Sequence, residues 1–249
     1  MNSIKKLWSF LKGFIILNLL WYIASIMMNS RILPSPEKVY MNLPKLFENN
    51  FYVHILASLY RVAVGLVISF NIGVILGLSI GYFKGINKIL NPLVYFAYPI
   101  PKTALLPVVM TLYGLEDGSK ITIIVLITVF QVIVSVRDAV INLDGSNYNS
   151  LISLGATRLQ LFYHVTFPAI LSEVLTNIRV SIGTAFSILF FAEAYGTSYG
   201  VGYFIQDAWS RINYLDMYSG IIVLSLLGLA LFIIIDYVEE WACRWRRAI

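Results

Sequence analysis

Residues 144–168 read DGSNYNSLISLGATRLQLFYHVTFP and form the longest polar interval in the second half of the chain. Apolar residues recur in this interval at steps of three or more, which is the spacing of an apolar stripe on a helix. Gly155 interrupts the pattern and Pro168 ends it, because glycine permits a bend and proline lacks a backbone donor. We therefore predict two short helices that meet at a bend. By pattern alone, an amphipathic hairpin lying on a membrane surface is an equal interpretation.

The rest of the chain is strongly apolar. Its 249 residues are 59% hydrophobic and 12% charged, with a mean hydropathy of +0.78, whereas soluble domains are about half apolar and a quarter charged. The composition predicts an all-α polytopic membrane protein. The net charge of +5 is dispersed at the edges of apolar segments, which favours lipid head groups and argues against nucleic acid as the partner.

Six segments are candidates for crossing the bilayer, each approaching the roughly 20 residues that its hydrocarbon core requires. The third is broken by Pro99 and Pro101, and the fifth is the weakest because Arg179 and Glu193 bound a short apolar run. The six segments lie at about residues 11–28, 62–83, 89–113, 121–136, 180–192 and 217–235.

The flanking Lys and Arg residues predict the orientation, because cytoplasmic flanks carry the excess of positive charge. With the N-terminus inside, the inner flanks carry Lys5, Lys6, Lys12, Lys84, Lys88, Arg137, Arg158, Arg179, Arg244, Arg246 and Arg247. The outer flanks carry Arg31, Lys38, Lys45, Arg61, Lys120 and Arg211. We therefore expect a multi-pass protein of the cytoplasmic membrane with both termini and residues 144–168 in the cytoplasm.

Residues 144–168 resemble a signature of a known family. Gly155, nine further residues and then Val165-Thr166-Phe167-Pro168 resemble the motif E-A-A-x3-G-x9-I-x-L-P of permease subunits of binding-protein-dependent ABC importers. Asn149, Ser150 and Leu151 stand in place of Glu-Ala-Ala, which puts the contact of the family's glutamate in doubt. The resemblance implies that this loop couples the permease to an ATPase through Asn149, Ser150, Leu151, Gly155, Ala156, Arg158, Val165 and Pro168.

A second resemblance points to one group among these permeases. Residues 99–107, PIPKTALLP, resemble the P-x-P-K-x-A-x-x-P stretch in permeases of the nitrate, sulfonate and taurine group. Residues 58–65 resemble the S-L-x-R-x-x-x-G opening of the same family's core. The resemblance implies the type I ABC importer permease (MetI-like) fold. It also implies an N-terminal helix and outer connector over residues 1–57 and a permease core over residues 58–249.

Four residues are candidates for the translocation path or its gating: Pro99, Pro101, Lys102 and Glu193. Broken backbone at membrane depth is tolerated only where it is buried in protein or faces water. Lys102 within an apolar span favours a functional or paired role, and snorkelling to a helix end is the alternative. Glu193 lies before the glycines at positions 196, 200 and 202, and an ordinary interfacial carboxylate is the equal alternative.

The sequence lacks the residues of a catalytic centre. It contains no G-x-x-x-x-G-K-[ST] loop for a nucleotide, and His54 and His164 are its only histidines, without a paired metal ligand. We predict no catalytic residue, no metal site and no cofactor bound by this chain, and hence no enzyme activity of its own.

The resemblance implies that the protein translocates a small solute, such as a sulfonate, taurine or nitrate. ATP and Mg²⁺ would be held by a cytosolic ABC ATPase dimer. The other implied partners are an extracytoplasmic solute-binding protein and a second permease copy, making a homodimer in the lipid bilayer. An ATP-independent secondary carrier or channel is the alternative function.

Overall fold

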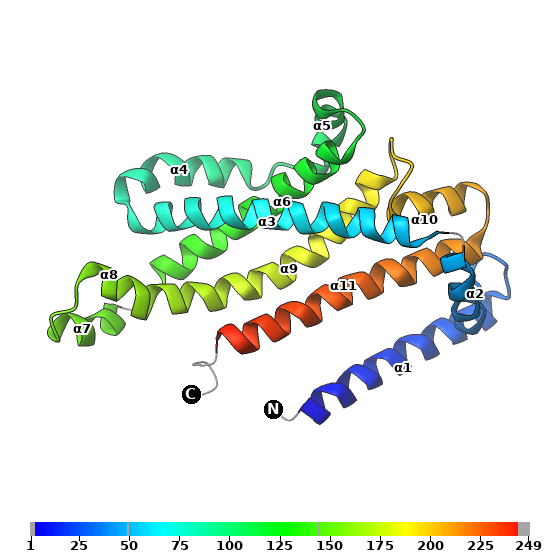
Figure 1. Ribbon diagram of the computed structural model, residues 1–249, viewed down its shortest axis with the longest axis horizontal. Coiled ribbons are helices and arrows are strands. Elements are labelled where there is room, and N and C mark those ends of the chain that lie inside the picture. The colour runs from blue at the N-terminus through cyan, green and yellow to red at the C-terminus, as the bar shows by residue number, and fades with distance from the viewer. Residues whose placement is uncertain (1–2, 49, 144, 244–249) are drawn as a thin grey trace.

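The computed structural model describes residues 3–48, 50–143 and 145–243, and every regular element in these ranges is helical (Figure 1). The elements are α1 (Ser3–Met28), α2 (Pro36–Glu48), α3 (Tyr52–Tyr82), α4 (Lys84–Ala97), η1 (Lys102–Leu105), α5 (Leu106–Tyr113), α6 (Asp117–Ile141), α7 (Gly145–Ser153), α8 (Arg158–Leu161), η2 (Phe162–Thr166), α9 (Phe167–Glu193), α10 (Val201–Ser210) and α11 (Tyr214–Ala242). Four residues named above lie outside the described residues. They are Asp144 and three of the inner flanking charges, Arg244, Arg246 and Arg247.

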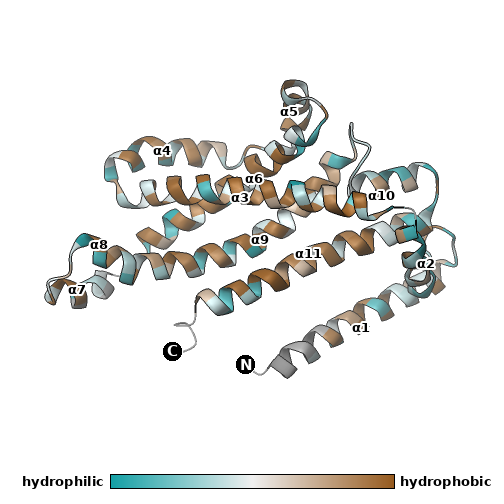
Figure 2. Cartoon of the chain, in the orientation of Figure 1, coloured by the Kyte–Doolittle hydropathy of each residue, from teal (hydrophilic) through white to brown (hydrophobic). Residues whose placement is uncertain are grey.

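The described helices account for the predicted apolar segments. Five of them are long and apolar enough to cross a membrane, and α4 with η1 and α5 forms a bent pair, angled by 83°, that counts as a sixth. Figure 2 shows hydrophobic residues along the long helices and hydrophilic residues gathered at helix ends and in the short α2. The fold is therefore the predicted all-α polytopic fold, with its third crossing broken.

The fifth crossing is longer than the sequence predicts. Helical structure runs from Arg158 through η2 to Glu193, whereas the pattern indicated only residues 180–192 as apolar. The charge that interrupts the pattern, Arg179, is paired with Asp236 and Glu239 of α11, each at 2.5 Å. This pairing compensates the charge, so Arg179 is accommodated within the crossing.

The expectation that Pro168 ends a helix is wrong. Pro168 lies in the first turn of α9, directly after the π-helical turn η2, in which the Phe167 amide donates to the Phe162 carbonyl. A proline in an α-helix deprives the carbonyl four residues earlier of its donor and clashes with it. The wider π turn absorbs this defect, so the helix carries on past the proline.

The centre of the fold is the packing of α3 on α6. Gly73, Gly77 and Gly81 of α3 lie against Val132, Val136 and Val140 of α6. Small residues on one face let two backbones approach closely, which is how helices associate in lipid. The helix α9 packs on the same pair through Ile170, Val174 and their neighbours.

The long helices connect two differently built ends. In Figure 1, α7 and α8 project at one end of the molecule, while α2 and α10 lie at the opposite end. Each of α3, α6 and α9 runs between the two ends. The predicted coupling loop and the Glu193 region are therefore far apart, and long helices are the structural link between them.

Candidate functional site

The bend between α7 and α8 is built by Gly155. This residue has φ +79°, a backbone conformation that favours glycine. Its amide donates to the Ile152 carbonyl at 2.9 Å, and the Ala156 amide donates to the Leu151 carbonyl at 3.0 Å. These two bonds are the Schellman pattern that ends a helix. The predicted bend at Gly155 is confirmed as local geometry.

The second short helix begins with a capping box. The Thr157 amide donates to Gln160 Oε1 at 2.8 Å, and the Gln160 amide donates to Thr157 Oγ1 at 3.4 Å. Two amides without helical partners are thereby satisfied reciprocally. The sequence signal for this cap is Thr157 followed by Gln three residues later.

The loop between the two helices presents apolar side chains. Leu154 is 82% exposed and Leu159 is 65% exposed, and Ile152 is exposed beside them. Asn149, Gly155 and Arg158 are also exposed, whereas Leu151, Ala156, Val165 and Pro168 are partly buried. The side chain of Ser150 lies outside what the structure describes. Apolar groups at the tip of an otherwise polar projection are a feature of surfaces that bind a partner.

Lys102 bonds to backbone carbonyls at the break after α4. Its ammonium donates to the carbonyls of Ala97 and Tyr98 at 2.9 and 2.7 Å, and it lies 4.7 Å from the ring centroid of Phe130. Pro99 and Pro101 are exposed in the same break. Lys102 thus adds a donor to carbonyls at the end of α4, of which that of Ala97 also accepts from the Ile100 amide at 3.3 Å.

A small pocket adjoins this break. Its volume is about 230 Å³, and its lining combines polar and apolar side chains from the break, α6 and α9. The lining residues are Tyr98, Ile100, Lys102, Thr103, Ile127, Phe130, Gln131 and Ile188.

Glu193 is the most enclosed of the predicted site residues. Its side chain is 0% exposed, and its carboxylate accepts from Arg61 Nη1 at 2.6 Å, from Ser58 Oγ at 2.8 Å and from the Gly202 amide at 2.8 Å. A carboxylate taken out of water needs such partners to remain stable. Lys102 and Glu193 contact different groups, so the structure does not bring these two together.

Arg61 connects several segments at this site, a role that the sequence did not predict. Besides Glu193, it reaches Asp117 at 2.7 Å and the Tyr199 carbonyl at 2.8 Å. It therefore joins α3 to the start of α6 and to the loop after α9. By the charge pattern, Arg61 is an outer flanking charge and not a site residue. The available signal was an arginine within the family-like motif at residues 58–65.

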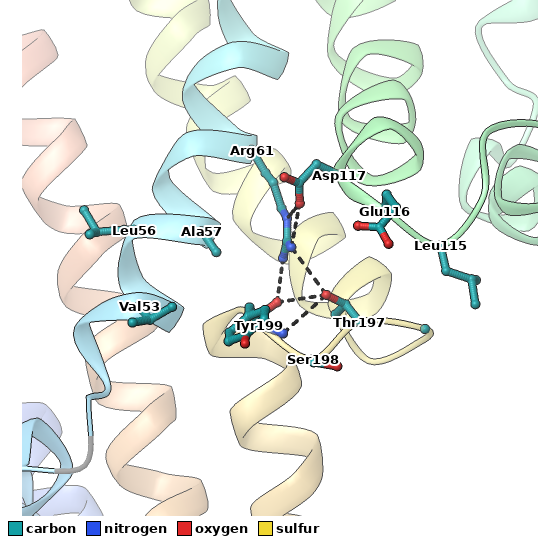
Figure 3. A pocket seen from close by; sticks show the side chains of 11 residues that line it. Val53, Leu56, Ala57, Arg61, Leu115, Glu116, Asp117, Thr197, Ser198 and Tyr199 are labelled. Atoms are coloured by element: carbon teal, nitrogen blue, oxygen red, sulfur yellow. Dashed lines mark hydrogen bonds and ion pairs between the residues drawn. The ribbon is translucent and has the colours of Figure 1, made fainter.

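These groups border a pocket of about 480 Å³, drawn in Figure 3. Arg61 points toward Asp117 on one side and toward Thr197 and Tyr199 on the other. The wall of this pocket comes from the first turns of α3, the residues before α6 and the loop after α9. The lining residues are Val53, Leu56, Ala57, Arg61, Leu115, Glu116, Asp117, Gly196, Thr197, Ser198 and Tyr199.

This chain is similar to a known protein family and to named transport permeases. The family described as binding-protein-dependent transport system inner membrane component matches residues 72–244. The formylaminopyrimidine transport permease protein ThiX of Halalkalibacterium halodurans is 29% identical, with 94% of each chain covered. The taurine transport system permease protein TauC of Escherichia coli is 28% identical, over 87% of this chain and 82% of its own length.

Solved structures show the same fold at low sequence identity. A chain of a bacterial alginate ABC transporter, in complex with its alginate pentasaccharide-bound periplasmic protein, superposes with a TM-score of 0.66. Its identity to this chain is 16%, and 97% of each chain is covered.

Proposed function

Since this chain belongs to the family of binding-protein-dependent transport system inner membrane components, we propose that it translocates a small solute delivered by a separate binding protein and driven by a separate ATPase. Membership makes the chain a permease subunit of an ABC importer, with the type I (MetI-like) fold and multiple membrane crossings. The observation that carries the proposal is the family match together with permease relatives that align over nearly the whole chain.

The proposed orientation places α7 and α8 in the cytoplasm, together with both termini, in the cytoplasmic membrane. The excess of Lys and Arg in the inner flanks supports it. The Arg61 and Glu193 cluster then lies at the outer end. Residues 1–57 form an N-terminal crossing and outer connector, and residues 58–249 form the permease core.

The α7–α8 projection is the proposed docking site for the ATPase. Exposed Leu154 and Leu159 supply apolar contact area, and exposed Asn149 and Arg158 supply polar contacts. ATP and Mg²⁺ are bound by the ATPase dimer, and the permease itself binds no cofactor. A second permease copy completes a homodimer, so that each ATPase subunit receives one projection.

Lys102 and the two prolines before it are proposed to shape the translocation path. Because the ammonium is committed to the carbonyls of Ala97 and Tyr98, its role is to hold the break between α4 and η1. Glu193 is proposed to act in gating, since its pairing with Arg61 fastens three segments at the outer end.

The solute is proposed to be a small polar molecule, such as taurine, another sulfonate, nitrate or a pyrimidine. Relatives are named for formylaminopyrimidine and for taurine at nearly equal identity.

The test is affinity purification of the tagged protein from native membranes in mild detergent, followed by mass spectrometry. Recovery of an ATPase with a phosphate-binding loop is the expected result, and a co-purified binding protein then identifies the solute. Recovery of the chain alone, from membranes in which other ABC complexes stay intact, would overturn the proposal in favour of an ATP-independent carrier or channel.

A further inference from the structure

A side-chain hydrogen bond ties the projecting helix α7 to the root of α9. The hydroxyl oxygens of Tyr148 in α7 and Thr166 in η2 lie 3.0 Å apart. Thr166 is fully buried and Tyr148 is partly buried. A buried hydroxyl that loses its partner is costly, so this contact favours one position of α7 relative to α9.

A third element joins the same contact. Tyr82, the last residue of α3, interacts with the side chains of both Thr166 and Tyr148. Its ring lies 6.2 Å from that of Phe162 in η2, and the Phe162 ring lies 6.3 Å from that of Phe167. The contact therefore joins α7 to two core helices, α3 and α9.

The contact is made at the π-helical turn. Thr166 is the last residue of η2, and Pro168 follows two residues later. π turns inside longer helices are found mostly as single turns at functional positions. This turn is the one place where the helix from Arg158 to Glu193 departs from regular α-helical bonding in its first half. Along the chain, α7 joins this helix through residues 154–157, so the Tyr148–Thr166 contact is a direct tie between α7 and the root of α9.

We propose that Tyr148 and Thr166 are positioning residues, which brace the π turn so that a displacement of α7 is delivered to α9 as motion of one body. The inference rests on the proposed docking of the ATPase on α7 and α8. Coupling between distant sites requires an element whose arrangement both sites bias. The Tyr148–Thr166 contact makes α7 and α9 into such an element.

The experiment measures the distance between spin labels at Gly145→Cys in α7 and Val180→Cys in α9, in a Cys243→Ala background. Gly145 has open space around it and Val180 is exposed. The labelled chain is studied in complex with its ATPase, with and without ATP and vanadate. Four further substitutions are compared: Tyr148→Phe, Thr166→Val, Thr166→Ser and Tyr237→Phe.

The labelled chain is diluted with unlabelled chain, so that only one protomer of each dimer carries labels. Within that protomer, the braced chain is expected to give one narrow distance that nucleotide does not change. Loss of one neutral hydrogen bond shifts a local equilibrium by about two- to tenfold, so Tyr148→Phe and Thr166→Val should populate a second distance that grows with nucleotide. Thr166→Ser keeps the hydroxyl and should behave as the parent chain. Tyr237→Phe removes an exposed hydroxyl from α11 and should also leave the distance unchanged.

The inference is overturned if Tyr148→Phe and Thr166→Val keep the single parental distance in both states, or if Thr166→Ser behaves like Thr166→Val. Tyr148→Phe provides the test on its own if Thr166→Val does not fold. Absence of the ATPase from the purified parent complex would contradict the proposed function instead. Distances measured on the permease alone would then still show whether Tyr148→Phe and Thr166→Val populate a second arrangement of α7 and α9.

Discussion

The guanidinium of Arg61 lies 2.6 Å from the carboxylate of Glu193, and both side chains are almost completely buried. The two residues are 132 positions apart in the chain. Their pairing fastens the first third of α3 to the last residue of α9. The same guanidinium also holds Asp117 at the start of α6.

Replacing Arg61 by Met should destabilise the protein strongly, because it leaves the Glu193 carboxylate buried without its counter-charge. Removal of one partner of a buried pair costs about 3–5 kcal/mol. The measurement is thermal unfolding in detergent, where the double variant Arg61→Met, Glu193→Gln should recover part of the loss. Arg211→Met is the control, since Arg211 forms an exposed pair with Asp207 worth less than about 1 kcal/mol. Equal shifts for Arg61→Met and Arg211→Met would contradict the assigned role.

Replacing Gly200 by Ala should disrupt the same cluster from the other side. Gly200 has φ +133°, and an added Cβ would lie 2.3 Å from the Glu193 carboxyl carbon. Strained backbone and overpacking each cost about 1–3 kcal/mol, so a clear loss of thermal stability is expected. Gly118→Ala, with no atom within 4 Å of the new Cβ, should leave the unfolding temperature nearly unchanged. A harmless Gly200→Ala would show that this loop adjusts freely.

Replacing Gly155 by Ala should weaken co-purification of the ATPase without affecting insertion into the membrane. The added Cβ would meet no atom within 4 Å, but the φ of +79° costs an L-residue about 1–2 kcal/mol. The α7–α8 bend should therefore open, and the amount of ATPase recovered per permease should fall. Gly85→Ala, which also meets no neighbouring atom, serves as the control. If both variants recover the parental amount of ATPase, the bend does not organise docking.

Replacing Gly77 by Ala should force α3 and α6 apart. The new Cβ would lie 2.7 Å from Val136 Cβ and 2.8 Å from the Ile133 carbonyl oxygen, and the backbone atom cannot move aside cheaply. Overpacking of this kind costs about 1–3 kcal/mol, which thermal unfolding in detergent would detect. Gly183→Ala in α9 has its nearest neighbour at 3.8 Å and should be tolerated. Similar behaviour of the two variants would argue against close packing as the role of Gly77.

Replacing Lys102 by Met should slow transport without changing which solute is carried. The variant removes the ammonium that donates to the carbonyls of Ala97 and Tyr98, so the break after α4 loses its brace. Uptake by whole cells should show a lower maximal rate with an unchanged half-saturation concentration. A changed order of preference among competing solutes would instead place Lys102 in contact with the solute.

Much of this architecture is determined by local sequence. Six apolar segments are visible because the free energy of transferring a side chain into lipid depends mainly on the side chain itself. The bend at Gly155 is visible for a similar reason, since the positive φ is a property of one residue. The broken third crossing follows from the prolines at positions 99 and 101, each of which removes a backbone donor.

Only the tertiary structure decided how the polar groups are satisfied. Sequence pattern suggested that Pro168 ends a helix, yet a π turn lets the helix continue. Arg179 interrupted an apolar run, yet its carboxylate partners lie on α11. Glu193 and Lys102 are charged residues beside or within apolar segments. In the folded protein Glu193 pairs with Arg61, and Lys102 donates to backbone carbonyls. A buried charge is stable only beside its counter-charge or donors, and which segments supply them depends on helix packing between residues far apart in the chain.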